Sequence, residues 1–143
     1  MSAYDPLMLD HQLCFPLYVA SREVIRLYTP HLSALNLTYT QYIAMMALWE
    51  KKSLPVKALC ERLYLDTGTL TPLLKSMEQK GLITRRRSET DERSVTVTLT
   101  GKGAALHDRA LQVPQQVGSC IPLTEEDAAK LYQLLYQIIG GLQ

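Results

Sequence analysis

The sequence predicts a mainly α-helical protein with one small β-hairpin. Apolar residues recur at helical spacing over most of the chain, whereas residues 82–99 combine a period-two alternation with a polar, turn-rich middle. Helix-capping residues stand before most of the helical segments. The 143 residues are 47% hydrophobic and 20% charged, which suits one domain that buries a core without metals or disulfides. We therefore expect residues 1–143 to form a single domain.

The first two helices are predicted from apolar spacing and capping. The first should run from about residue 9 to residue 28, where apolar residues follow one face, and Pro30 should end or bend it. The second should run to about Glu50 and opens with the capping-box pattern Thr38-x-x-Gln41.

The remaining helices are predicted from the residues at their ends. Pro55 stands at the start of a short third helix, and Asp66 can cap a fourth helix that stops at Gly81. Thr100 starts a fifth helix, and Thr124 caps the last one.

The hairpin defines the fold more closely. Two short, tightly joined helices followed by a basic hairpin are typical of a winged helix-turn-helix, here over residues 54–99. The second helix of such a pair fits the major groove of DNA. The helical segments 1–35 and 104–143 carry more apolar surface than this small lobe can cover, so we expect them to be dimerisation helices of a homodimer.

Positive charge is concentrated around the hairpin. The chain has a net charge of +1, with 15 basic and 14 acidic residues. Residues 75–102 contain seven basic and four acidic residues, a local charge of +3. Such a face is a candidate phosphate-binding surface, although a solvated surface loop has the same composition.

Several classes of protein are disfavoured. No apolar run is long enough to span a bilayer, and the N-terminus lacks a secretory pattern, so we expect a cytoplasmic protein without membrane contact. Three cysteines do not make a disulfide framework. His11, His31 and His107 do not cluster with other ligands, so no metal site is expected. With no nucleotide-binding loop and no catalytic triad, we expect neither a cofactor nor an enzyme.

The segment ERLYLDTGTLTPLLKSMEQKGLITRRRSETDERSVTVTLTGKG, residues 61–103, resembles the recognition helix and wing of the MarR family. The triplet Asp91-Glu92-Arg93 is a strong mark of that family. The segments LDHQLCFPLYVASREVIRLY and LTYTQYIAMMALWE resemble its organic-hydroperoxide-sensing branch, OhrR. The similarity covers nearly the whole chain and weakens after residue 113.

The resemblance implies a repressor that binds a pseudo-palindromic site in double-stranded DNA. Asp91 would pair with Arg93 and hold the wing tip, and Arg93 would enter the minor groove, where a planar cation suits the negative potential. The other DNA contacts implied on the helix are Thr67, Gly68, Thr69, Thr71, Pro72 and Lys75, and those beside the wing are Arg85, Arg86 and Arg87. Small residues let the start of the helix approach bases and phosphates closely.

Cys14 is the candidate sensing thiol. It lies near the start of the first helix, where Pro16 suits a first turn and the helix dipole favours an anion. Tyr18, Tyr28 and Tyr39 follow it by 4, 14 and 25 residues, as in the OhrR-like pattern. The resemblance implies that tyrosine hydroxyls, some from the other subunit, stabilise the thiolate, and that an organic hydroperoxide oxidises it.

The other two cysteines have different expected roles. Cys120 lies in the loop where two-cysteine members of the branch keep a resolving cysteine, although a free surface thiol is the simpler interpretation. Cys60 is in phase with Val56 and Leu63 on the third helix and should be a core residue.

Three alternatives remain open at this point. The first is a MarR-type repressor that senses a small aromatic ligand, in which case DNA release would not need Cys14. The second is a thiol peroxidase that uses Cys14, which would show multiple turnovers with a reductant. A purely structural partner protein would show no salt-sensitive affinity for DNA.

Overall fold

The structure is a computed structural model that describes residues 5–91 and 93–143. Residues 1–4 of the N-terminal segment and Glu92 of the wing triplet lie outside the described residues. The chain divides into two compact units, Met1–Val113 and Pro114–Gln143. Among the described residues, no helix is long and apolar enough to cross a membrane.

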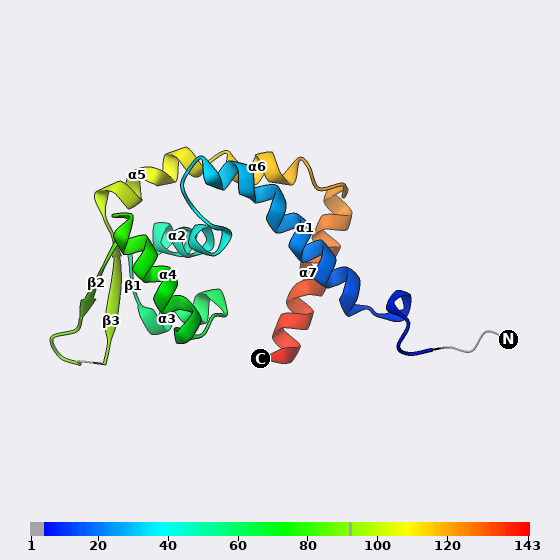
Figure 1. The fold of residues 1–143 in the computed structure, drawn as a ribbon, viewed down its shortest axis with the longest axis horizontal. Coiled ribbons are helices and arrows are strands. Elements are labelled where there is room, and N and C mark those ends of the chain that lie inside the picture. The colour runs from blue at the N-terminus through cyan, green and yellow to red at the C-terminus, as the bar shows by residue number, and fades with distance from the viewer. Residues whose placement is uncertain (1–4, 92) are drawn as a thin grey trace. The chain divides into compact units, whose positions relative to one another are not determined.

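The expected fold class is confirmed, because helices predominate and a small antiparallel sheet interrupts them (Figure 1). The first unit contains the short 3-10 turn η1 (Leu9–His11), α1 (Cys14–Ser33), α2 (Tyr39–Lys51), β1 (Ser53–Pro55), α3 (Val56–Leu63), α4 (Thr67–Gln79), β2 (Ile83–Arg87), β3 (Val95–Leu99) and α5 (Gly101–Ala110). Helix α6 (Val113–Gly118) crosses the boundary between the units, and α7 (Glu125–Leu142) belongs to the second unit.

Local capping explains where the helices begin. Thr38, Asp66, Thr100 and Thr124 each cap a helix by accepting the backbone N–H of the residue three positions on. At Thr38 the full capping box is present. Gly81 has a positive φ of 78°, a conformation that favours glycine, directly after the C-terminal cap of α4. These five predicted end signals are confirmed.

The prediction for the first helix is partly wrong. Helix α1 begins at Cys14 rather than near residue 9, and it continues through Pro30 to Ser33. A proline inside a helix removes one backbone hydrogen bond. The last turn of α1 is nevertheless retained, because Leu32 is almost fully buried in the core.

The sheet has one strand more than the predicted hairpin. Its order is β1-β3-β2, with both pairs antiparallel. The central strand β3 contains the fully buried Val97, which pairs with Leu54 on one side and Arg85 on the other. Strand β1 therefore joins the segment before α3 to the wing.

The core fixes the orientation of α4. Leu70, Leu74 and Met77 follow one face of this helix and are buried. The largest buried side chains around them are Met45 and Leu48 of α2, Leu59 of α3, Ile83 of β2 and Val97 of β3. The opposite face of α4 remains exposed, and the β2–β3 hairpin lies beside it in the same unit (Figure 1).

Two helices leave large apolar side chains exposed in the single chain. Helix α7 has no buried residue. Its exposed apolar residues are Leu131, Tyr132, Leu134, Tyr136, Ile138 and Leu142, and those at the start and middle of α1 are Phe15, Leu17, Tyr18 and Ile25. Such surface is typical of a protein-protein interface.

Gly103 gives a test of the packing between α5 and the turn after α4. A Cβ atom at this position would overlap the carbonyl oxygen of Leu82. We predict that Gly103→Ala lowers the free energy of unfolding by about 1–3 kcal/mol, as overpacking does. Denaturant unfolding measures this, and Gly101→Ala, which meets nothing within 4 Å on the same helix, is the control. Equal stability of the two variants would contradict the packing described here.

Candidate DNA interface and thiol site

The exposed face of α4 is suited to close contact with a ligand. All six residues that the resemblance assigns to it are exposed: Thr67, Gly68, Thr69, Thr71, Pro72 and Lys75. Asp66 accepts the N–H of Thr69 at 2.6 Å. Hydrogen bonding from the side chain and then the backbone of Thr69 lowers the pKa of the Asp66 carboxyl. The hydroxyl of Thr71 donates to the carbonyl of Thr67 at 2.8 Å. These bonds organise the first turn of the helix.

Gly68 is not required by the protein's own packing. A Cβ atom there would lie 3.5 Å from the Asp66 carboxylate, an ordinary contact, and its φ is not positive. The missing side chain therefore leaves the first turn of α4 open toward whatever lies against it.

A basic cleft separates the helix pair from the wing. Its volume is about 470 Å³, and Lys57, Thr67, Thr71, Arg85, Arg87 and Arg93 are among its lining residues. Glu61 is the acidic residue that also lines it. The fold thus brings together threonines of the helix and arginines of the wing. Arg86, which is exposed, alternates to the other face of β2.

The wing tip differs from the expected arrangement. The Asp91 carboxylate accepts the backbone N–H of Arg93 at 3.0 Å. Among the described residues, no ion pair joins the Asp91 carboxylate to the Arg93 guanidinium. Asp91 therefore fixes the backbone of the tip, while the exposed side chain of Arg93 is left to face the cleft.

Arg85 is bound within the protein, which the sequence did not indicate. Glu78, at the end of α4, accepts the backbone N–H of Arg85 at 3.0 Å and its guanidinium at 3.2 Å. The Arg85 hydrogen bond and charge hold the pKa of the Glu78 carboxyl below its usual range. These two hydrogen bonds, here called the Glu78–Arg85 bracket, join the recognition helix to the first strand of the wing. The buried Nε of Arg85 has no partner among the described residues.

Cys14 is exposed and is the first residue of α1. Leu13, at the cap position, provides no side-chain acceptor, so no side chain caps the first-turn N–H groups. Pro16 lies in this turn, as predicted, and the first turn contains no acidic residue. The position therefore suits a thiolate anion.

The tyrosines lie at two separate places. Tyr28 and Tyr39 meet edge to face, with ring centroids 4.9 Å apart, and Tyr42 lies 5.7 Å from Tyr28. Burial raises the pKa of all three hydroxyls, so they keep their protons at neutral pH. Fourteen residues of α1 separate Cys14 from Tyr28, which corresponds to about 21 Å along the helix. Within one chain this tyrosine cluster cannot reach the thiol.

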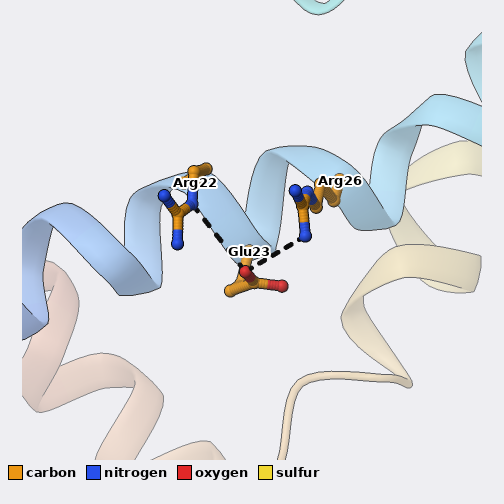
Figure 2. Close-up of polar contacts among 3 residues, drawn as sticks. All are labelled: Arg22, Glu23 and Arg26. Carbon is orange, nitrogen blue, oxygen red and sulfur yellow. Dashed lines mark hydrogen bonds and ion pairs between the residues drawn. The ribbon is translucent and has the colours of Figure 1, made fainter.

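Tyr18 lies one turn after Cys14 in a different environment. The guanidinium of Arg22 lies over its ring, 5.4 Å from the centroid. Arg22 and Arg26 also flank Glu23, with nitrogen–oxygen distances of 3.9 and 3.4 Å (Figure 2). These ion pairs are exposed and contribute little to stability, but they hold a cation against Tyr18.

The remaining cysteines are also placed. Cys120 is exposed in the turn after α6, and its thiol donates to the carbonyl of Gln116 at 3.5 Å. The prediction that Cys60 is a core residue is wrong. It is half-buried, lies 3.9 Å from the hydroxyl of Thr67 and lines the basic cleft, while Leu59 takes the core position on α3.

Comparison with known proteins identifies the family. Residues 26–110 match the family model described as transcriptional regulator SarA/Rot. The chain belongs to this family of transcriptional regulators. It is 49% identical over 139 residues to the organic hydroperoxide resistance transcriptional regulator of Bacillus subtilis (strain 168), covering 97% of this chain and 95% of that protein. This similarity confirms the resemblance to the OhrR branch.

Solved structures agree with this assignment. The reduced AbfR bound to DNA has a TM-score of 0.79 and 31% identity, covering 94% of each chain. A MarR mutant from E. coli complexed with operator DNA has a TM-score of 0.76 and 27% identity, covering 88% of this chain and 92% of that one. The relatives of this MarR-type regulator are named as transcriptional regulators and not as enzymes. The alternative that the chain is a thiol peroxidase is therefore dropped.

Gly68 gives a test of the helix face of this regulator. We predict that Gly68→Ala leaves the free energy of unfolding unchanged or raises it by up to about 1 kcal/mol, because the methyl group fits and restricts the unfolded chain. The same methyl group should weaken binding to operator DNA by about tenfold or more, the size of one specific contact. Fluorescence anisotropy with operator DNA measures the affinity, and Gly101→Ala is the control. Unchanged affinity would exclude Gly68 from the interface.

Proposed function

We propose that this regulator binds a pseudo-palindromic operator as a homodimer and releases it when an organic hydroperoxide oxidises Cys14. The observation that supports this most is the placement of an exposed thiol at one end of α1 and a cluster of tyrosines at the other. The similarity to a regulator named for organic hydroperoxide resistance supports the same signal.

The DNA-binding part of the proposal rests on α4 and the wing. The exposed threonines and Gly68 would meet base edges and phosphates in the major groove. Arg93 would enter the minor groove beside it, and Arg86, Arg87 and Lys75 would contact phosphates. Arg85 would contribute mainly through its bracket to Glu78, because that ion pair already occupies its guanidinium. The similar solved structures of reduced and of overoxidised AbfR are complexes with DNA.

The exposed apolar helices and the length of α1 support the proposed dimer. Helices α1 and α7 would be covered by a second copy of the chain. Within one chain, Cys14 and Tyr28 are about 21 Å apart along α1 and cannot meet. In a symmetric dimer, Tyr28 and Tyr39 of one subunit would instead meet Cys14 of the other. Each protonated hydroxyl would then donate a hydrogen bond to the thiolate.

The oxidation of Cys14 would take place in two steps. The Cys14 thiolate attacks the terminal oxygen of the hydroperoxide, the O–O bond breaks, and the alkoxide takes a proton and leaves as the alcohol. The sulfur is oxidised to a sulfenic acid. A second thiol, Cys120 of the other subunit, then displaces the hydroxyl as water and forms a disulfide. Loss of the tyrosine hydrogen bonds would change the subunit packing and the spacing of the two recognition helices.

A second candidate signal is a small anionic ligand. A cavity of about 350 Å³ in the first unit is lined in part by the apolar residues Leu35, Leu82 and Leu106. Lys80, Lys102 and Arg109 also line it, and they bond to backbone carbonyl groups there. Its volume lies within the range of small-molecule sites. DNA release by such a ligand would not need Cys14.

The role of Cys14 is tested by substitution. We predict that Cys14→Ser binds operator DNA like the wild type, with affinity falling steeply as salt rises, but is not released by cumene hydroperoxide. A gel shift with and without the peroxide measures this. Cys60→Ser is the control and should be released normally. Release of Cys14→Ser by the peroxide would overturn the proposal and favour the ligand-sensing alternative.

The role of Cys120 is tested separately. After peroxide treatment, a disulfide-linked dimer should appear on a non-reducing gel for the wild type and for Cys60→Ser, and it should be absent for Cys120→Ser. The exposure of Cys120 in a turn favours this, because a disulfide requires Cα atoms within about 7 Å and a turn can move to meet it. A linked dimer of Cys120→Ser, or a mixed disulfide of the wild type with a small thiol, would show that Cys14 acts without Cys120.

A further inference from the structure

Gln41 is the one buried polar residue among the residues that the structure describes, with 4% of its surface exposed. It lies in the first turn of α2, between Tyr39 and Tyr42 of the tyrosine cluster. An apolar side chain would suit this depth better unless the amide had specific partners, because burying an amide is costly.

The Gln41 amide joins two helices. Its oxygen accepts the backbone N–H of Thr38 at 3.2 Å and the ammonium of Lys80 at 2.8 Å. Its nitrogen donates to the hydroxyl of Ser76 at 3.1 Å. Ser76 lies in the recognition helix α4, and Lys80 is its C-terminal cap. The start of α2 and the end of α4 are therefore held by the same side chain.

The ammonium of Lys80 extends this network to the connection between α1 and α2. It also donates to the carbonyl of Asn36, just after α1, at 2.7 Å. Tyr28 of α1 and Tyr39 of α2 are in ring contact. A movement of the tyrosine cluster would displace the start of α2 and the connection between α1 and α2, and both are bonded to the C-terminal end of α4. Because a buried amide with fixed partners tolerates little change in geometry, the displacement would pass to α4 rather than be absorbed.

We propose that Gln41 is a positioning residue that couples the tyrosine cluster to the recognition helix. In the reduced protein it sets the orientation of α4 relative to α2. When the thiol is oxidised and the tyrosine cluster moves, the bonds of Gln41 to Ser76 and Lys80 transmit that movement to α4. This inference rests on the proposed function, because it needs a signal that reaches the tyrosines.

The test compares thiol oxidation with DNA release in Gln41→Met, which keeps the side-chain length and removes the amide. Mass spectrometry measures the gain of oxygen at Cys14 after cumene hydroperoxide. Anisotropy measures operator affinity before and after oxidation. We expect Cys14 of this variant to be oxidised normally. The ratio of the operator affinity of the reduced protein to that of the oxidised protein should be about tenfold smaller than in the wild type, a change within the usual range of coupling between sites.

Two further variants separate coupling from a general loss of stability. Gln41→Glu keeps the capping box and the bond to Lys80, and the Ser76 hydroxyl can donate to it, so most of the ratio should return. Lys51→Met, at the exposed end of the same helix α2, is the control and should keep the wild-type ratio. If Gln41→Met does not fold, Ser76→Ala removes one Gln41 partner and should lower the ratio in the same direction.

The outcomes distinguish the inference from the proposed function. A wild type that keeps the operator after Cys14 is oxidised would overturn both. A wild type that releases it, together with Gln41→Met or Ser76→Ala releasing it equally, would overturn only the role of Gln41. A ratio lowered equally in Gln41→Met and Gln41→Glu would also contradict the role, because the hydrogen bonds would then not be the cause.

Discussion

The length of α1 is the constraint on which the sensing site depends. A straight helix keeps Cys14 and Tyr28 about 21 Å apart, so the two cannot meet in one chain. Tyr39 is bound to the same end by its ring contact with Tyr28. A thiolate stabilised by these hydroxyls therefore needs a second subunit. In the proposed dimer, this would connect chemistry at the thiol directly to subunit packing.

The recognition helix depends on its packing in the same way. Its apolar face, with Leu70, Leu74 and Met77, is buried, so its glycine and threonine face must be exposed. Its far end is held by polar contacts, with Glu78 bonded to Arg85 of the wing and Ser76 bonded to Gln41 of α2. The helix is thus positioned at one end by the wing and by the helix that carries the tyrosines, while its other end is free to meet DNA.

The sequence predicted the features that are local. The caps at Asp66 and Thr100 were predictable because a side-chain oxygen reaches an amide only three residues away. Strand β1 was not, because it has three residues and exists only through pairing with β3, as in Ser53 with Thr98. The continuation of α1 past Pro30 also depends on tertiary packing rather than on local preference.

The candidate site shows the same division. The residue types of α4, the wing and the Cys14 segment were readable from the sequence through their resemblance to a family. The bond of Asp91 to a backbone amide, the half-buried position of Cys60 and the Glu78–Arg85 bracket depend on how side chains meet in space. The role of Gln41 in a capping box was predicted from the sequence, but its burial and its bonds to Ser76 and Lys80 were not, because these partners lie 35 and 39 residues away.

The central claim, that the thiol site is shared between two chains, is tested most directly by mixing variants. One chain carries Cys14→Ser with intact tyrosines, and the other carries Tyr28→Phe and Tyr39→Phe with intact Cys14. In a heterodimer the remaining thiol would face the intact tyrosines of its partner. We predict that mixing restores the wild-type rate of peroxide oxidation at Cys14 in the heterodimer fraction. A rate that stays at the slow value of the tyrosine variant alone would contradict a shared site.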